Sequence, residues 1–266
     1  LYTILWGQVA IFIYSISHAL NLPREPALLL GGMLQTSFPL QIASIALQAM
    51  GIVVAWMSKR QSQKAHRLPL EYFGLLSAAT LCLMLFVKSA NFVTFFITLE
   101  ASSLFIALLL MLGAPHNPLA PKNALKYLIQ SGLSGVIVLW GLVFLYIHSG
   151  SFQYDHVGQS LLGPGTVWAK VGVGLIISGL FFKLGLFPFS FYLPEIYQNA
   201  SRPVLGFIAT ASKFATAVVL ICLLAQPFRG QWEALTPLML DIVIISLIWG
   251  AFSALHQVHV HRLLAL

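Results

Sequence analysis

Residues 179–188 read Gly-Leu-Phe-Phe-Lys-Leu-Gly-Leu-Phe-Pro, and they are the most informative part of the sequence for the architecture. It is apolar enough for a membrane helix, yet it carries one charged side chain, Lys183, and ends in a proline. Pro188 has no N–H to donate to the carbonyl of Leu184, and its ring crowds that carbonyl. We therefore expect the helix to stop or kink within a turn of Lys183.

A lysine and a broken helix are both unfavourable in hydrocarbon. A lysine at mid-depth costs about 2.5 to 3.5 kcal/mol on insertion scales, and backbone groups released by a break need hydrogen-bond partners. Both features are tolerated where the backbone lines a wet cavity, as in the broken helices that form ion sites in transporters. The alternative is that Lys183 snorkels from a helix end to the lipid headgroups.

The composition is typical of a polytopic membrane protein. Of 266 residues, 59% are hydrophobic and 8% are charged, and the mean hydropathy is +0.89, which excludes an ordinary soluble domain. The net charge of +7 comes from basic residues that gather in a few loops. No basic face with interleaved aromatic residues indicates nucleic-acid binding, so the basic excess favours a role in membrane orientation.

Eight apolar runs are long enough to cross about 30 Å of hydrocarbon. No linker rich in serine, glycine or proline divides the chain, and no fixed repeat is evident. We predict an all-α, polytopic membrane protein with about eight transmembrane helices, one of them discontinuous and broken by proline, forming a single membrane domain over residues 1–266. The predicted spans lie near residues 3–20, 35–57, 70–87, 92–113, 123–148, 167–187, 203–226 and 235–254.

Four charged side chains lie well inside apolar runs: Glu100, Lys126, Lys183 and Lys213. Without compensation their insertion would cost on the order of 10 kcal/mol, comparable with the stability of a whole domain. Glu100 needs a cation nearby to stay charged, and Lys126 and Lys183 are the candidates. A static buried ion pair is the alternative to a proton-transfer role.

Lys213 lies in the middle of its apolar run and has small and hydroxyl-bearing neighbours, among them Thr210 and Thr216. Such neighbours leave room for water and offer hydrogen bonds, which a proton path requires. A snorkelling lysine on a packing helix is the alternative. We predict that Lys213 belongs to a proton path.

Neither metal binding nor disulfide formation is indicated. His256, His259 and His261 are spaced i, i+3 and i+5, which does not place all three on one helix face. Cys82 and Cys222 lie in apolar runs with no CxxC or Cys/His spacing. We therefore expect no metal site and no disulfide.

Six segments together resemble the antiporter-like membrane subunits of respiratory complex I. Two of them, Leu193-Pro194-Glu195-Ile196-Tyr197-Gln198 and Ala209-Thr210-Ala211-Ser212-Lys213, are most similar to NADH:ubiquinone oxidoreductase chain 2, also called subunit N. The resemblance covers about residues 33–266. The segments that carry it are residues 71–73, 89–100, 124–127, 179–188, 193–198 and 209–213.

The resemblance implies a partial antiporter-like fold and a module that couples NADH:ubiquinone electron transfer to proton transport. Glu100 and Lys183 match the family's interhelical charge pair, Lys126 its additional lysine, and Lys213 the central lysine of its proton route. The family places no redox centre in this subunit, so NADH, FMN, iron–sulfur clusters and ubiquinone are expected in other subunits. The implied partners are other complex I membrane subunits and membrane lipids, and no nucleic acid.

Three questions remain open at the level of the sequence: how the fold is completed, in which membrane the protein lies, and to which function class it belongs. The second half of the family's inverted repeat is not found in these 266 residues, so we expect a second polypeptide to complete the fold, with a truncated chain as the alternative. We expect the mitochondrial inner membrane, with the bacterial plasma membrane as the alternative. Other function classes are a subunit of a multi-subunit sodium/proton antiporter or membrane-bound hydrogenase, and a structural spacer whose charges only hold helices together.

Overall fold

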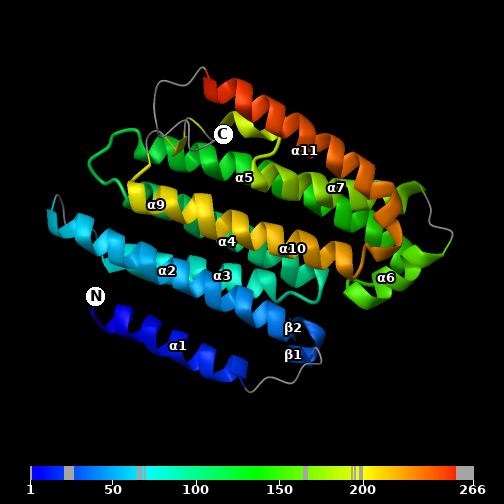
Figure 1. Ribbon diagram of the computed structural model, residues 1–266, viewed down its shortest axis with the longest axis horizontal. Coiled ribbons are helices and arrows are strands. Elements are labelled where there is room, and N and C mark those ends of the chain that lie inside the picture. Colours follow the sequence, from blue (N-terminus) through cyan, green and yellow to red (C-terminus); the bar gives the residue numbers. More distant parts are fainter. Residues whose placement is uncertain are drawn as a thin grey trace.

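The computed structural model is a bundle of long helices that run side by side along its longest axis (Figure 1). It describes residues 2–20, 27–64, 68, 70–163, 167–192, 194, 196–197 and 200–255. Its helices are α1 (Tyr2–Leu20), α2 (Phe38–Lys64), α3 (Leu70–Val87), α4 (Phe92–Leu112), α5 (Ala120–Ser149), α6 (Tyr154–Leu162), α7 (Val167–Leu184), α9 (Arg202–Phe207), α10 (Lys213–Ala225) and α11 (Trp232–Leu255). Shorter helical turns are η1 (Leu30–Gly32), η2 (Phe189–Tyr192), η3 (Ile208–Ser212) and η4 (Arg229–Gln231).

Seven helical segments of the described chain are long and apolar enough to cross a membrane. They correspond to the last seven spans expected from the sequence, and the first expected span is α1, whose apolar part, Trp6–Ser17, is shorter. The predicted class, an all-α polytopic membrane protein, is confirmed. The seven segments are Phe38–Arg60, Leu70–Val87, Phe92–Leu112, Ala120–Ser149, Val167–Leu184, Arg202–Ala225 and Arg229–Leu255.

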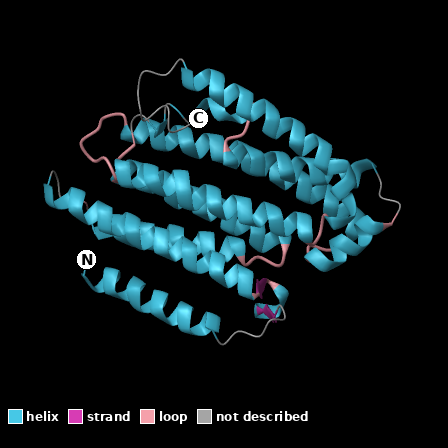
Figure 2. Ribbon diagram, viewed as in Figure 1, coloured by secondary structure: helices cyan, strands magenta, loops and turns pink. Residues whose placement is uncertain are grey.

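The helices pack mainly on their neighbours in the chain. α1 lies against α2, and the series continues through α3, α4, α5 and α7, while α10 packs across α3 and α7. In the view of Figure 1, α1 and α11 lie at opposite edges of the bundle. The only strands in the described residues, β1 (Ala27–Leu29) and β2 (Leu34–Thr36), pair antiparallel at one end (Figure 2).

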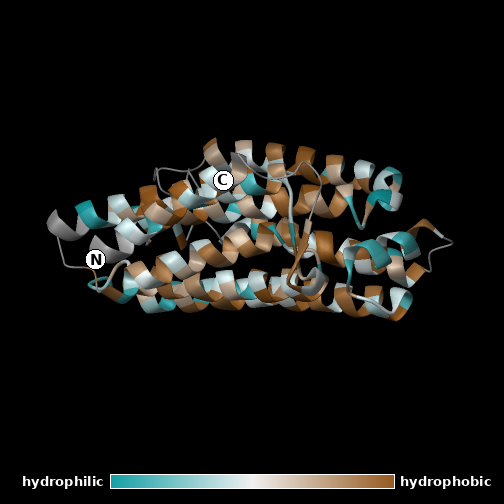
Figure 3. Ribbon diagram, turned by 90° about the horizontal axis from the view of Figure 1, so that it is seen from below, coloured by the Kyte–Doolittle hydropathy of each residue, from teal (hydrophilic) through white to brown (hydrophobic). Residues whose placement is uncertain are grey.

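Apolar residues, brown in Figure 3, recur along all the long helices. Leu81, Ile129, Trp140, Ile221 and Leu247 are each more than half exposed, although they lie in the middle regions of long helices. So much exposed apolar surface is unfavourable in water but is what a lipid-facing helix requires. The bundle therefore presents its apolar faces to the membrane.

The expected helix break is present, and a glycine makes it. α7 ends at Leu184, and Gly185 has a positive φ of 76°. The N–H of Gly185 bonds to the Phe182 carbonyl (3.1 Å) and the N–H of Leu186 bonds to the Phe181 carbonyl (3.1 Å), which is the Schellman arrangement. The helix thus stops one residue after Lys183 as predicted, but Gly185 rather than proline terminates it.

The segment after the break is held by α11. The N–H of Phe187 donates to Ser246 Oγ at 3.0 Å, and the rings of Phe187 and Trp249 lie 5.4 Å apart. A backbone donor left by the broken helix is thereby satisfied by a side chain, as hydrocarbon requires. The break is consequently a built feature of the bundle.

α5 and α7 approach closely because glycines face each other across their contact. A Cβ on Gly172 would lie 2.9 Å from the Gly141 carbonyl oxygen and 3.1 Å from the Phe144 Cβ. Inside a membrane no hydrophobic effect drives helices together, so they associate largely through van der Waals contact. Small residues allow the close approach that this contact needs. This contact fixes where the end of α7, and with it Lys183, sits relative to α5.

We predict that Gly172→Ala destabilises the protein by about 1 to 3 kcal/mol, because the added methyl group meets backbone atoms that cannot move independently. Gly174 is the matched control, since nothing lies within 4 Å of a Cβ placed there. Gly174→Ala is expected to leave stability unchanged or raise it by up to about 1 kcal/mol through helix propensity. Thermal unfolding of the purified protein measures both, and equal stabilities would contradict the close contact.

Candidate functional site

The four predicted charged residues are each partly buried, and each lies on a different helix. Glu100 is in the middle of α4, Lys126 is near the start of α5, Lys183 is in the last turn of α7, and Lys213 begins α10. Their surroundings decide which of them act together.

The amine of Lys183 points at α4. It donates to the Leu99 carbonyl oxygen at 2.9 Å, to Ser102 Oγ at 3.2 Å and to Ser103 Oγ at 2.9 Å, and the Phe86 ring centroid lies 5.8 Å away. Residues at i, i+3 and i+4 share one face of a helix, so α4 offers three acceptors together. The ammonium has three donors, and all three are used inside the bundle rather than at the headgroups.

Glu100 faces α5. Its carboxylate lies against the backbone at Gly135, and its Oε1 is buried without a hydrogen-bond partner among the described residues. Glu100 and Lys183 are close enough to interact electrostatically. Because α4 occupies all three donors of Lys183, no direct hydrogen bond joins the amine to Glu100. Their role as a functional charge pair stays a prediction.

Lys213 follows directly after a π-helical turn, η3. A π turn holds one residue more than an α turn and is frequent at functional sites. It lies inside the expected span over residues 203–226, which the structure has as one helical segment, Arg202–Ala225. The Lys213 amine lies 6.0 Å from the ring centroid of Tyr197, whose hydroxyl is buried without a hydrogen-bond partner among the described residues. The Lys213 amine and the Tyr197 ring therefore lie near each other beside the π turn.

A small cavity lies between Lys183 and Lys213. Its volume is about 20 Å³, which is enough for one water molecule. Both lysines line it, together with hydroxyl groups from α5 and from η3. The full lining is Tyr127, Ser131, Ser134, Phe182, Lys183, Ile208, Ser212 and Lys213.

Proton transfer between two amines needs groups that hold, release and relay a proton. Each amine can hold or release a proton, and hydroxyl groups and a single water can donate and accept at the same time. Transfer between positioned acid and base groups requires hydrogen-bond reach, directly or through one water. The cavity that both lysines line has room for one such water.

Lys126 is not among the residues that line the cavity. It precedes Tyr127, which does line it, and is partly buried on α5. The structure thus brings Lys183 and Lys213 to one cavity, and neither Glu100 nor Lys126 lines it. Its role as an additional proton-carrying lysine stays a prediction.

Lys88, between α3 and α4, belongs to a separate polar cluster. Its amine donates to Gln41 Oε1 at 2.6 Å, and burial lowers its pKa from the ordinary value. Gln41 in turn donates to the Ser15 carbonyl oxygen of α1 at 3.2 Å. These bonds join α1, α2 and the α3–α4 turn, as interhelical polar contacts do in membranes.

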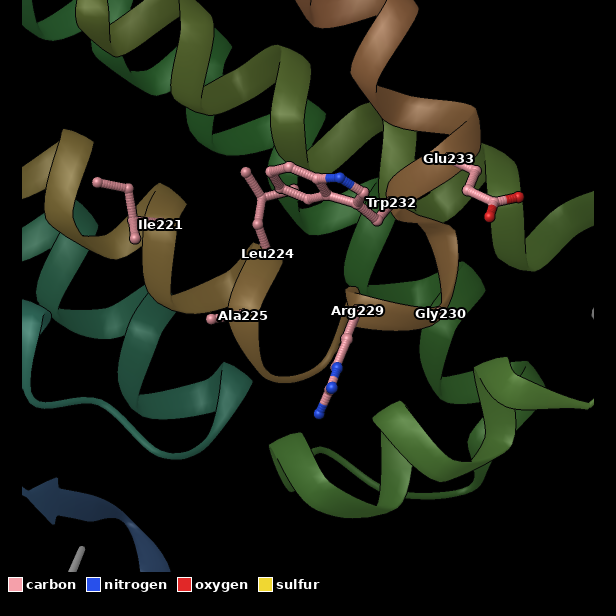
Figure 4. A pocket seen from close by; sticks show the side chains of 7 residues that line it. All are labelled: Ile221, Leu224, Ala225, Arg229, Gly230, Trp232 and Glu233. Carbon is pink, nitrogen blue, oxygen red and sulfur yellow. The ribbon is translucent and has the colours of Figure 1, made fainter.

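A much larger cavity, of about 680 Å³, lies elsewhere, between the end of α10 and the start of α11 (Figure 4). Its two charged side chains, Arg229 and Glu233, point in different directions in Figure 4. None of the four predicted residues lines it. Its lining is Ile221, Leu224, Ala225, Arg229, Gly230, Trp232 and Glu233.

Sequence reasoning missed the hydroxyl residues that complete the site. Tyr127, Ser131 and Ser134 are spaced i, i+4 and i+7, which places them on one face of α5, and Ser102 and Ser103 lie within a turn of Glu100. Polar side chains on one face of an apolar helix were the available signal. Four residues named from the sequence lie outside the described chain: Glu195, His256, His259 and His261.

We predict that Ser102→Ala and Ser103→Ala each destabilise the protein by about 1.5 to 3 kcal/mol, the range for hydrogen bonds to a charged group. The control is Ser178→Ala on α7, because Ser178 Oγ bonds only locally, to the Gly174 carbonyl at 2.8 Å. That change should have little effect on stability. Thermal unfolding measures all three variants, and an equal effect of Ser178→Ala would contradict the special position of the α4 serines.

Comparison with known proteins places this chain in a family. The model of the family described as NADH:quinone oxidoreductase/Mrp antiporter, TM, matches residues 89–266. NADH-quinone oxidoreductase subunit N 1 of Opitutus terrae is 29% identical over an alignment of 246 residues, and the match covers 88% of this chain and 48% of that protein. The range that the family model matches contains all four predicted residues, Glu100, Lys126, Lys183 and Lys213.

Solved structures share the fold. A chain of respiratory complex I from Thermus thermophilus with bound aureothin has a TM-score of 0.78 at 23% identity, covering 99% of this chain and 56% of that chain. A chain of the Mrp complex from Dietzia sp. DQ12-45-1b has a TM-score of 0.81 at 15% identity, covering 99% and 50%. The chain spans about half the length of the relatives it matches. It belongs to the NADH:quinone oxidoreductase/Mrp antiporter family of membrane proteins and has the antiporter-like fold.

Proposed function

We propose that this chain is a proton-translocating, antiporter-like subunit N of respiratory complex I. The observation that carries the proposal is a water-sized cavity inside an apolar bundle, lined by both Lys183 and Lys213. The curated relatives named subunit N support complex I as the parent assembly. In this role the 266 residues act as one membrane domain.

The electrostatic interaction of Glu100 with Lys183 controls the proton in this proposal. While the carboxylate stays near, it stabilises the charged amine by several kcal/mol at separations of a few ångströms and an effective dielectric constant near 20. A charge change in a neighbouring subunit moves the carboxylate away and removes that stabilisation. The proton then passes from Lys183 through the cavity to Lys213.

The energy for this step comes from outside the chain. We assign NADH, FMN, iron–sulfur clusters and ubiquinone to other subunits, and we assign to this chain only the proton path. The partners are the other membrane subunits of complex I and surrounding lipids. The completion of the fold by a second polypeptide stays a prediction, and mass spectrometry of the purified assembly tests it: one continuous peptide running past Leu266 would reject it.

A sodium/proton antiporter subunit is the second candidate, and the fold shared with the Mrp complex of Dietzia favours it. The names of the sequence relatives favour complex I. Those relatives are bacterial, which supports the bacterial plasma membrane over the mitochondrial inner membrane as the location of this multi-pass protein.

Purification of the assembly through a tag on this chain tests the proposal. We expect flavin and iron–sulfur subunits to copurify, and we expect NADH oxidation by the assembly in sealed vesicles to drive proton release. Copurification with antiporter subunits alone, and sodium-dependent proton movement without NADH, would support the second candidate instead.

A further inference from the structure

The Glu100 carboxylate lies in a space that only glycine leaves open. A Cβ on Gly135 of α5 would overlap Glu100 Oε1, and it would lie 2.7 Å from Cδ and 3.2 Å from Oε2. Real Cβ contacts are not this short, so any larger residue at position 135 must displace the carboxylate or the helix. The position of Glu100 in this structure depends on the missing side chain.

The helix itself does not require glycine at position 135. Gly135 lies within α5 and has no positive φ, so alanine would be compatible with the backbone. Alanine is favoured over glycine inside helices by about 1 kcal/mol. The requirement for a small residue therefore comes from the facing carboxylate.

No direct contact with Lys183 holds Glu100 where it lies. The three donors of the Lys183 amine are used by Leu99, Ser102 and Ser103, and Oε1 of Glu100 is buried without a hydrogen-bond partner among the described residues. A buried oxygen without a hydrogen-bond partner is unfavourable. A second position of the carboxylate, in which it bonds to the Lys183 amine, therefore competes with the observed one. The Lys183 amine is the cation with which Glu100 interacts electrostatically.

We propose that Gly135 is a positioning residue that gives Glu100 a second resting place, apart from Lys183. With glycine at position 135 the carboxylate alternates between the α5 backbone and the Lys183 amine. With a methyl group there, it stays at the amine and holds the proton on Lys183. This inference rests on the proposed function, because it adds the device by which the Glu100–Lys183 interaction is released.

The test uses the complete assembly in sealed vesicles and compares Gly135→Ala with Gly132→Ala. Gly132 lies one turn away on α5, and nothing lies within 4 Å of a Cβ placed there, so it is a matched control for helix propensity. We expect NADH-driven proton release to fall at least tenfold in Gly135→Ala and to stay at the wild-type rate in Gly132→Ala. Equal rates in Gly135→Ala and wild type would overturn the proposal.

A rescue variant separates positioning from packing. Glu100→Asp shortens the side chain by one methylene and withdraws the carboxylate from α5. We expect Gly135→Ala/Glu100→Asp to pump faster than Gly135→Ala and at the rate of Glu100→Asp alone. A double variant no better than Gly135→Ala would show that the methyl group acts on helix packing, and this would overturn the proposal.

Assembly is measured for each variant before activity. If Gly135→Ala fails to assemble and the double variant assembles, the conflict lies between these two side chains, which supports the proposal; if neither assembles, the conflict lies with the backbone and the proposal fails. Normal pumping by Gly135→Ala, with pumping lost in Lys213→Ala, removes only this inference. Normal pumping by Lys213→Ala removes the proposed function itself.

Discussion

Replacing Lys183 with methionine is expected to slow proton transfer through this subunit about 100-fold or more. Lys183 lines the cavity and interacts electrostatically with Glu100. Methionine keeps much of the side-chain volume but can neither hold nor release a proton. Positioned acid–base groups contribute about 10² to 10⁴ in rate. NADH-driven proton release by the assembled complex in vesicles, at equal content of this chain, measures the loss.

The control for Lys183 is Lys170, an exposed lysine on the same helix. Lys170→Met removes the same charge from α7 without touching the cavity, so we expect the wild-type rate. Equal losses in both variants would indicate that α7 needs positive charge in general, and would remove the specific role of Lys183.

Lys213→Ala is expected to have an effect of similar size, about 100-fold, because it removes the acceptor at the other end of the cavity. The substitution also deletes the amine beside the Tyr197 ring and enlarges the cavity. Electron transfer in the same complex is measured in parallel, because a lost proton path with intact assembly separates a transport defect from misfolding.

The control for Lys213 is Arg202, which is exposed at the start of α9 in the same membrane span. Arg202→Ala should leave proton release unchanged. Undiminished pumping by Lys213→Ala would exclude Lys213 from the path and would favour the structural spacer, in which the charges only join helices.

The sequence was sufficient to predict the spans, because membrane helices are long and uniformly apolar and need no tertiary information to be recognised. It was also sufficient to predict the region of the break and four unusual charges, since a charge in an apolar run is conspicuous whatever it contacts. Lys183 is the clearest case. Its neighbours in the sequence already indicated an interior position, and its hydrogen bonds to α4 agree with one.

The partners of these charges could not be predicted, because they come from the packing of distant helices. Nothing in the sequence marks Ser102 as a partner of a charged residue. It accepts a hydrogen bond from Lys183 only because α4 and α7 pack together. Gly135 is one of several glycines, and only the position of Glu100 makes it different from Gly132.

Local chain geometry explains two further differences. The break was attributed to Pro188, the residue that cannot continue a helix, but Gly185 ends α7 first because it can adopt a positive φ and form the closing hydrogen bonds. The π turn before Lys213 left no sign in the sequence, since Ile208–Ser212 is compatible with an ordinary helix. The π turn is seen only in the folded chain.

In the proposed mechanism one proton passes Lys183 and Lys213 in series, and the double variant Lys183→Met/Lys213→Ala is the decisive test. Proton release by the assembled complex is measured for the double variant and for each single variant. Steps on one path are not additive, so the account predicts that the double variant loses no more than the more impaired single variant. A loss equal to the product of the two single losses would show that the lysines act independently, and would contradict the account.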